Sequence, residues 1–372
     1  MINRVYIDNF KCFVNFECRP QSLQLLLGDN GTGKTTLFDV LETLRDFVCT
    51  GTELMTAFPS NTLTAWDNRA EQRFELGMAG NGGEYVYRLV VEHDRAGPRN
   101  RIKAERLEFD GQPLYEFDGH EAHLYRDDFS PGPVFPFDWS RSAIPTIPER
   151  GDNQSLSWFR RQLRKVYVFS PDPLRMLTRS EAELDKPDRE LHDLVSWLRH
   201  LSQESVDTVS RLRDVLRDEV IEGLDNMKLE KVSEATRALK FEFKFASKGN
   251  GRAFSLLFDQ LSTGQRNLVA LFAILHAAVE KDATVCIDEP DNYVALRELQ
   301  PWLTLVRDRV EDEDGQCLLI SHHPELINYL AAQHGLRFFR EEMGPTRAQP
   351  FDGKTDELIA PAEIVARGWD QT

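Results

Sequence analysis

Residues 28–35, which read GDNGTGKT, have the residue types and spacing needed to hold the phosphate groups of a nucleotide. Glycines let backbone amides point inward at the phosphates, and a helix that follows adds its positive end. The pattern predicts that Lys34 reaches the β and γ phosphates and that Thr35 ligates Mg²⁺. The other residues of this segment expected to bind the nucleotide are Asn30, Gly31, Thr32, Gly33 and Thr36.

An acidic pair, Asp288 and Glu289, directly follows the apolar run of residues 284–287. An aspartate at the end of a buried parallel strand can hold Mg²⁺ through water, as phosphoryl-transfer sites require. The adjacent glutamate is placed to orient or deprotonate the attacking water. Alone, the pair would be two surface acids that close a strand. Together with the phosphate-binding segment, it predicts a site for nucleotide hydrolysis.

Residues 261–265, which read LSTGQ, precede a helix expected to begin near Arg266. A serine hydroxyl, a glycine and free helix N-terminal amides make a second anion-binding surface, so Ser262, Gly264 and Gln265 are candidate nucleotide-binding residues. Standing alone, the same residues would be an ordinary helix N-cap. Because one γ-phosphate does not need two such surfaces, we expect this one to close over a nucleotide bound by a second copy of the chain.

A histidine, His322, follows the apolar run and serine of residues 318–321. This run is expected to be a strand beside the one that ends in Asp288, so His322 can contact the γ-phosphate and report its presence. His323 is the weaker candidate because its side chain should point to the other face. The remaining histidines form no pattern typical of a metal site.

Apolar spacing predicts the elements that position these residues. Strands are expected at 5–7, 23–27, 85–91, 102–109, 166–169, 241–245, 284–287 and 317–320. Helices are expected after Lys34, over 191–216 with an end near Gly223, after residue 265, and around 303–310. The proline-rich residues 129–151 are expected to form a long loop, and the acidic residues 311–315 a solvated turn.

The composition argues against several classes of protein. The chain has 372 residues, with 45 basic and 61 acidic side chains and a net charge of −16, which argues against a protein that coats nucleic acid non-specifically. The five cysteines are scattered and form no C-x-x-C pair, as in a reduced cytoplasmic protein. We expect no signal peptide, because the sequence begins directly with an alternating strand. We expect no membrane span, because the longest apolar run, residues 268–279, is too short and contains His276.

Three segments resemble the ABC-type ATPase heads of the RecF, SMC and OLD-nuclease group. They are residues 7–13 (IDNFKCF), residues 258–266 (FDQLSTGQR) and residues 320–324 (ISHHP). The resemblance implies that two heads sandwich two ATP molecules as a homodimer, with Ser262 and Gly264 acting on the nucleotide of the partner. It also implies that Asp291 and Asn292 belong to a loop that couples the two sites.

The expected fold class is α/β, a P-loop NTPase of the ABC-type head kind with a mixed central sheet, an antiparallel β lobe and a short helical subdomain. We expect residues 1–372 to form a single composite head. Its parts are a P-loop segment (1–50), a β-rich lobe (51–175), a helical insertion (176–226), the half with the signature, acidic pair and switch histidine (227–345), and a C-terminal tail (346–372).

The chain also differs from the RecF, SMC and OLD-nuclease group that it resembles. No glutamine loop can be placed, the helices are too short for an SMC coiled coil, and the residues after Arg340 are too few for the Toprim nuclease of OLD proteins. The chain is therefore similar to the stand-alone ATPases of bacterial anti-phage and toxin–antitoxin-like modules. We expect it to bind ATP and Mg²⁺ and to switch a separately encoded effector protein, a nuclease or a toxin.

Two other functions remain open at this stage. A DNA-repair ATPase like RecF would need a basic strip, for which Arg160, Arg161, Arg164 and Lys165 are candidates, although a solvated helix face is the simpler interpretation. An ATP-binding scaffold with little turnover is the other alternative. The presence of Lys34, Asp288 and Glu289 counts against the scaffold, because a scaffold does not need the glutamate.

Overall fold

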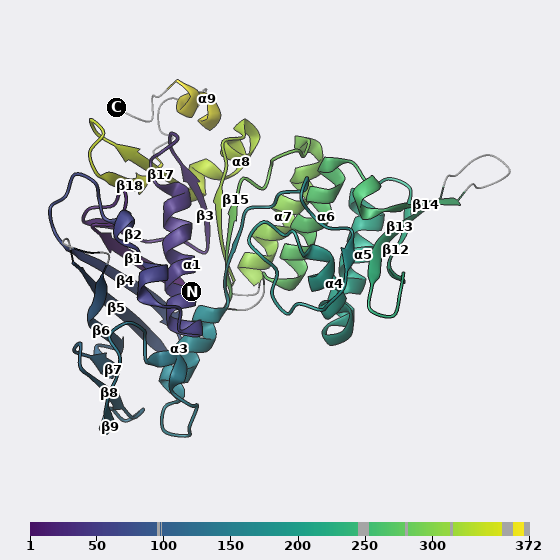
Figure 1. Cartoon of the computed structure of the whole chain (residues 1–372). Helices are drawn as coiled ribbons and strands as arrows, with labels where there is room; N and C mark the ends of the chain where they lie inside the picture. The colour runs from purple at the N-terminus through teal and green to yellow at the C-terminus, as the bar shows by residue number, and fades with distance from the viewer. Residues whose placement is uncertain are drawn as a thin grey trace. The chain divides into compact units, whose positions relative to one another are not determined.

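The computed structural model describes residues 1–94, 97, 99–244, 253–279, 282–312, 315–351 and 360–367. Phe245, predicted within a strand, and Glu313 and Asp314, predicted within the acidic turn, lie outside these residues. The chain forms two compact units (Figure 1). Unit 1 comprises Met1–Tyr167, Asp282–Thr284 and Leu326–Thr372, and unit 2 comprises Val168–Lys281 and Val285–Glu325. The predicted internal boundaries at residues 50, 175, 226 and 345 stay predictions.

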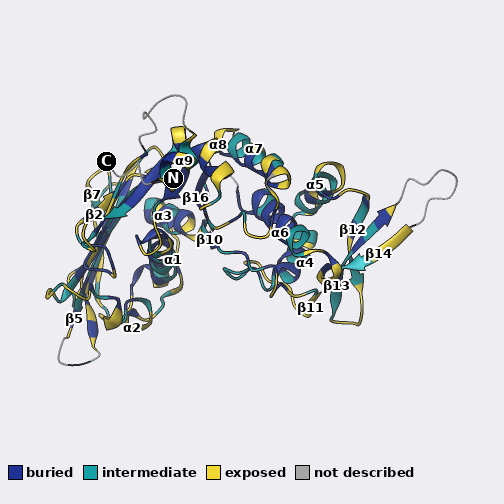
Figure 2. Cartoon of the chain, turned by 90° about the horizontal axis from the view of Figure 1, so that it is seen from above, coloured by how far each residue is buried: buried dark blue, intermediate teal, exposed yellow. Residues whose placement is uncertain are grey.

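Unit 1 contains an eight-stranded sheet in the order β2-β1-β4-β5-β6-β7-β8-β9, with antiparallel pairing throughout. Its strands are β1 (Ile2–Asp8), β2 (Phe16–Cys18), β4 (Glu71–Gly80), β5 (Gly83–His93), β6 (Asn100–Phe109), β7 (Gln112–Phe117), β8 (Glu121–Tyr125) and β9 (Pro131–Pro136). In β5 every second residue from Tyr85 to Val91 is fully buried, which makes one face of the sheet part of the core (Figure 2). The predicted antiparallel β lobe is confirmed.

The exposed face of this sheet carries a chain of ion pairs. It begins at Glu17 on β2, crosses β1, β4, β5 and β6, and ends at Glu116 on β7, with acidic and basic side chains in alternation. Its members in order are Glu17, Arg4, Glu75, Arg88, Glu108, Arg106 and Glu116. Opposite charges on neighbouring strands attract each other, so this face does not present the uniformly basic surface that phosphate contacts require.

The prediction of a long loop over 129–151 is wrong in part. Pro131–Pro136 form β9 and Ile144–Thr146 form a 3₁₀ turn, η2. β9 is the last strand of the sheet, and its outer edge needs no donors from the backbone, so prolines are tolerated there. The short hairpin strands β7 and β8 were also not predicted individually.

Glu105 on β6 is a buried carboxylate inside unit 1. It is 1% exposed, and its oxygens accept hydrogen bonds from Tyr87 Oη (2.8 Å), Ser142 Oγ (2.7 Å) and Tyr115 Oη (3.1 Å). Burial raises the pKa of Glu105 from 4.5 to about 6, despite the three donors. The unfolded chain keeps the ordinary pKa. The stability that this group contributes is therefore fully present below pH 4.5 and is lost as the pH rises through 6.

We expect Glu105→Gln to flatten the pH dependence of the free energy of unfolding between pH 4.5 and 7. The wild-type chain should lose about 2 kcal/mol over this interval through Glu105, at roughly 1.4 kcal/mol per pKa unit, and the variant should not. Urea unfolding at several pH values measures the difference. Glu121→Gln, at a half-exposed position on β8, is the control and should keep the wild-type slope. Equal slopes for Glu105→Gln and the wild type would contradict the expectation.

A second part of unit 1 carries the predicted strand, glycine-rich segment and helix. β3 (Leu23–Leu27) is buried along its whole length and is followed by residues 28–33 and then by α1 (Lys34–Thr50). β3 pairs in parallel with β17 (Gly335–Arg340), which pairs antiparallel with β18 (Thr346–Pro350), so this sheet is mixed as predicted. The remaining helices of this unit are α2 (Leu54–Ala57), α3 (Gln154–Arg164), most of α8 (Pro324–His334) and α9 (Pro361–Ala366).

The chain passes into unit 2 within β10 (Val166–Phe169). This unit contains α4 (Leu194–Glu204), α5 (Val206–Val215), a π turn η3 (Leu216–Val220), α6 (Thr263–Ala277) and α7 (Leu296–Asp312), with most of β15 (Thr284–Asp288) and all of β16 (Gln316–Ile320). A further sheet has the order β11-β13-β12, with β14 on β13; its bounds are β11 (Arg179–Ser180), β12 (Leu224–Lys231), β13 (Arg237–Lys244) and β14 (Ala253–Leu257).

Helix α6 forms the centre of unit 2. Residues 267–275 of α6 are all buried, and α5 and α7 pack against the helix (Figure 2). The predicted buried helix after the LSTGQ segment and the predicted short helical part are thereby confirmed. The helices before β12 end at Val220, near Gly223 as predicted. In the described parts of the chain, no helix is both long and apolar enough to cross a membrane.

Candidate nucleotide site

The glycine-rich segment of unit 1 is a tight loop, which we call the phosphate loop (residues 28–35). Two of its glycines cannot be replaced without a collision. A Cβ on Gly28 would lie 2.1 Å from the carbonyl oxygen of Phe338, and one on Gly33 would lie 2.7 Å from Cys12 Sγ. Both residues also have positive φ angles, 136° and 97°, which side chains disfavour. The neighbouring strand and turn therefore require glycine at these positions.

Lys34 places its ammonium group inside the phosphate loop. The residue is 6% exposed, and Nζ donates hydrogen bonds to the carbonyl oxygens of Gly28 (2.6 Å) and Asp29 (3.0 Å). A buried cation within a curled backbone is the arrangement that favours a bound anion. The position suits the role predicted for Lys34, and the contact of its ammonium with phosphate stays a prediction.

The start of α1 is suited to an anion for a second reason. Its N-cap is Gly33, and within the described residues no side chain caps this end, while the first turn contains no acidic residue. The positive end of the helix dipole therefore lies at the N-terminus of α1, where no side chain of the first turn offsets its charge. A phosphate group supplies the negative charge that the first turn of this helix does not contain.

The other residues of the phosphate loop that were predicted to bind the nucleotide differ in how far they are exposed to solvent. Asn30, Gly31 and Thr35 are exposed and Thr36 is half-buried, so these residues can reach a ligand from the loop surface. Thr32 is buried, and its Oγ1 donates to the carbonyl oxygen of Asp29 at 2.8 Å. Thr32 therefore stabilises the turn with its side chain, and its expected contribution to nucleotide binding is through the backbone.

The acidic pair lies in unit 2, at the end of β15. Asp288 is half-buried and Glu289 is exposed, with a φ of 52° that is unusual for glutamate. Two contacts hold this conformation: the Glu289 amide donates to the carbonyl oxygen of Ile320 (2.9 Å), and Glu289 Oε2 accepts from Asn292 Nδ2 (2.7 Å). The backbone is thus fixed to the end of β16, and Asn292 orients the carboxylate.

Ser262 is the N-cap of α6. Ser262 Oγ accepts from the amide of Gln265 (3.2 Å), and Gln265 Oε1 accepts from the amide of Ser262 (3.1 Å), which is a reciprocal capping box. The cap that the sequence indicated is therefore present. The contacts of Ser262, Gly264 and Gln265 with a nucleotide stay predictions, and the side chain of Gln265 has a structural role in this state.

A contact that the sequence analysis missed joins α6 to the loop after the acidic pair, residues 289–294. Asn267, fully buried in α6, donates through Nδ2 to the carbonyl oxygens of Pro290 (3.1 Å) and Asn292 (2.7 Å). One helical turn earlier, the position of a Cβ on Gly264 is only 2.6 Å from the carbonyl oxygen of Tyr293. An asparagine directly before the apolar residues 268–275 was the signal that could have revealed this contact.

The two histidines after β16 have different environments. His322 is exposed, whereas His323 is half-buried and its Nδ1 accepts a hydrogen bond from the amide of Glu325 (3.3 Å) at the start of α8. The amide of His323 in turn donates to Ser321 Oγ (2.9 Å). His323 is therefore engaged in the helix start, and His322 remains the better placed of the two for a ligand.

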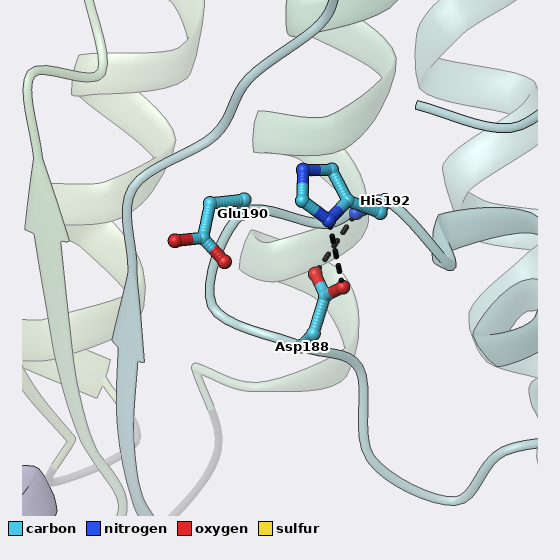
Figure 3. Close-up of side chains that lie close together, drawn as sticks. All are labelled: Asp188, Glu190 and His192. Carbon is cyan, nitrogen blue, oxygen red and sulfur yellow. Dashed lines mark hydrogen bonds and ion pairs between the residues drawn. The ribbon is translucent and has the colours of Figure 1, made fainter. Parts of the chain in front are cut away.

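One group among the described residues has the spacing of metal ligands: Asp188, Glu190 and His192 in unit 2 (Figure 3). The carbonyl oxygens of Glu190 and His192 accept from the amides of Asp172 and Leu177, and the side-chain contacts lie within the loop before α4. Asp188 pairs with His192 Nδ1 (3.1 Å) and accepts from the amide of His192 (2.9 Å), while the Asp188 amide donates to Asp193 Oδ1 (3.0 Å). We assign the side chains of Asp188 and His192 to the structure of that loop.

The candidate residues therefore fall into two groups. Unit 1 carries the phosphate loop, with Lys34 and Thr35. Unit 2 carries Asp288, Glu289, the N-cap of α6 and His322, and within unit 2 the structure connects α6 to the loop that follows Glu289. Two Mg²⁺ ligands were predicted from the sequence. Thr35 belongs to unit 1 and Asp288 belongs to unit 2. Hydroxyl and carboxylate oxygens are ligands that Mg²⁺ prefers.

Comparisons with known proteins place these motifs in context. A family model described as "AAA domain, putative AbiEii toxin, Type IV TA system" matches residues 25–328, a range that includes every candidate residue named above for the nucleotide. Among solved structures, the SMC head domain from Thermotoga maritima is similar, with a TM-score of 0.48 and 14% sequence identity over 94% of this chain and 99% of that chain. A search of curated proteins found no match.

Proposed function

The chain belongs to the family of AAA domains described as putative AbiEii toxin, type IV TA system, and we propose that it is a cytoplasmic ATPase that works as a dimeric switch. In this proposal the chain binds and hydrolyses ATP with Mg²⁺, and the ATP-bound dimer controls a separately encoded effector, a nuclease or a toxin. The family supports an ATPase of this general kind. We propose, beyond the family, that the chain forms a dimer, that it controls an effector and that single residues have the roles given below.

The observation that carries ATP binding is the buried Lys34 inside the phosphate loop. A cation enclosed by backbone carbonyls, at the uncapped start of a helix, is stabilised further by a phosphate group that adds opposite charge. Bound Mg²⁺ would neutralise charge on the phosphates, and Thr35 and Asp288 are the residues proposed to hold it.

Glu289 is the residue proposed to activate water. Its carboxylate is exposed and oriented by Asn292, and its backbone is fixed by the hydrogen bond from its amide to Ile320. A fixed carboxylate can accept a proton from an attacking water or hold that water in line. His322, exposed at the end of β16, is proposed to contact the γ-phosphate.

The proposed dimer follows from the second anion-binding surface. The N-cap of α6 lies in unit 2 and the phosphate loop in unit 1. The start of α1 has no side-chain cap, whereas Ser262 Oγ caps the amide of Gln265 at the start of α6, but both helices present the positive end of a dipole to an anion. We propose that Ser262 and Gly264 of one copy close over the nucleotide of the other. Tyr293, which is 57% exposed beside Gly264, is then placed to lie at this interface.

Gly264→Ala is expected to reduce ATP turnover by about 10-fold or more, because the new Cβ would lie 2.6 Å from the carbonyl oxygen of Tyr293 and displace the loop that begins at Glu289. Overpacking of this kind costs roughly 1–3 kcal/mol, so the chain should still fold. Steady-state turnover and thermal unfolding measure the two effects. Gly151→Ala, where a Cβ meets nothing within 4 Å, is the control. Wild-type turnover in Gly264→Ala would show that the contact is irrelevant.

An effector protein is favoured over DNA as the target because the three arginines of the candidate basic strip are engaged within unit 1. Arg160 Nη1 donates to three backbone carbonyls, of Ile144, Pro145 and Ile147. Arg161 pairs with Glu149 at 2.6 Å, and Arg164 donates to the carbonyl oxygen of Cys49. Arginines with these partners are poorly placed to neutralise DNA phosphates.

The first experiment is steady-state ATP turnover of the purified chain with and without linear duplex DNA, together with the molar mass by light scattering with and without ATP. We expect turnover that is indifferent to DNA and a mass that doubles with ATP. Turnover that rises with DNA would favour the repair ATPase. An absence of turnover despite ATP binding would favour the scaffold, and a mass unchanged by ATP would overturn the dimeric switch.

A further inference from the structure

The loop of residues 63–70, between the turn η1 (Ser60–Thr62) and β4, is firmly attached to the start of the chain. Asn9, which is fully buried, donates through Nδ2 to the carbonyl oxygen of Arg69 (2.8 Å) and accepts from the amide of Thr64 (3.2 Å). Arg69 also makes a bidentate ion pair with Asp8, at 2.6 and 2.9 Å. A loop held at both ends in this way keeps its side chains in defined positions.

The same region contacts the phosphate loop. The turn between β1 and β2 packs against Gly33, where the position of a Cβ is 2.7 Å from Cys12 Sγ and 3.0 Å from the ring of Phe13. Thr64 Oγ1 donates to the carbonyl oxygen of Phe13 at 3.4 Å, which joins this turn to the loop of residues 63–70. The loop is therefore connected to the phosphate loop through a single turn of chain.

Trp66, in the middle of this loop, is a large aromatic side chain that is 51% exposed. The guanidinium of Arg340 lies over its ring, 5.2 Å from the centroid. Arg340 Nη1 also contacts the carbonyl oxygen of Gly31 in the phosphate loop at 3.5 Å. Arg340 Nε and Nη2 donate to the carbonyl oxygens of Gly344 and Met343, both at 2.7 Å. One fixed arginine thus spans from the phosphate loop to the indole.

An exposed indole backed by a guanidinium is a surface for another flat aromatic group. Stacking of a nucleobase on an aromatic side chain contributes roughly 1–3 kcal/mol, and a nearby arginine adds a cation–π contribution. A nucleotide whose phosphates occupy the phosphate loop extends its ribose and base beyond the edge of that loop. Trp66 is the exposed aromatic residue that Arg340 holds next to this edge.

We propose that Trp66, supported by Arg340, is the platform on which the base of the bound nucleotide stacks. This inference rests on the proposed nucleotide binding and adds the residue that recognises the base. Every base has a flat π face, so stacking supplies affinity for a nucleotide over inorganic phosphate chains and does not choose between adenine and guanine.

The experiment compares the affinity of the full chain for ATP and for inorganic tripolyphosphate, both with Mg²⁺, by calorimetry. Trp66→Ala should weaken ATP binding by about 10-fold or more and leave tripolyphosphate binding unchanged, because only ATP carries a base. Trp66→Phe should keep most of the ATP affinity. Trp139→Ala is the matched control, since Trp139 is 45% exposed in the same unit but lies beside His93 and Arg101.

The outcomes separate the inference from the proposed function. Unchanged ATP affinity in Trp66→Ala, or an equal loss for both ligands, would overturn the stacking platform while nucleotide binding by the wild type stands. A wild-type chain that binds neither ATP nor tripolyphosphate would overturn the proposed function and the platform with it. A loss of ATP affinity in Trp139→Ala equal to that in Trp66→Ala would also reject the platform.

Discussion

Replacing Lys34 by alanine is expected to lower the affinity for ATP by about 100-fold or more. The ammonium is buried inside the phosphate loop, where the local dielectric is low, and hydrogen bonds between charged groups in such places are worth roughly 1.5–3 kcal/mol each. Without the ammonium, the β and γ phosphates each lose a charged hydrogen-bond donor, which accounts for the expected effect. Calorimetric titration of ATP with Mg²⁺ into each protein measures it directly.

The same substitution removes the hydrogen bonds that Nζ donates within the protein, to the carbonyl oxygens of Gly28 and Asp29. Thermal unfolding without nucleotide therefore has to be measured beside the titration, to show that the variant is folded. Lys103→Ala is the control, because Lys103 is half-exposed on β6, where it pairs with Glu71. An ATP affinity in folded Lys34→Ala equal to that of the wild type would remove the phosphate loop from the proposed function.

The phosphate loop could be predicted from the sequence because its chemistry is local. Gly28, Gly33 and Lys34 lie within one short segment between a buried strand and a helix, so spacing alone indicates where the backbone must turn and where a cation is needed. The Asp288–Glu289 pair was found for the same reason, at the end of an apolar strand. Even so, the partners of Gly28 and Gly33, Phe338 and Cys12, are distant in sequence and came only from the structure.

The residues that sequence reasoning missed act through long-range contacts. Asn267 directly precedes the apolar residues 268–275 of α6, which indicates that its amide needs a partner but not that the partners are the carbonyl oxygens of Pro290 and Asn292. Trp66 is a single aromatic residue in a polar loop, and its relation to the phosphate loop depends on Arg340, near the other end of the chain. Local patterns predict elements well, but the pairing of distant segments depends on the whole fold.

Glu289→Gln is expected to reduce ATP turnover by roughly 100- to 10,000-fold, the contribution typical of a positioned general base. ATP binding should be retained, because the change keeps the size of the side chain, and the new amide oxygen can still accept from Asn292 Nδ2. A variant that binds ATP and cannot hydrolyse it should accumulate as the proposed ATP-bound dimer. Light scattering with ATP should then show a larger fraction of dimer in the variant than in the wild type.

The control for this experiment is Glu298→Gln, an exposed glutamate in the first turn of α7 of the same unit, which should keep wild-type turnover. Turnover, ATP affinity and dimer formation together show whether Glu289 activates water or only holds the loop of residues 289–294. If the carboxylate only holds the loop of residues 289–294 through Asn292, the glutamine variant keeps that bond and turnover should be nearly normal. If it activates water, turnover is lost while ATP affinity and dimer formation remain. Normal turnover in Glu289→Gln would therefore assign the hydrolytic role to another residue.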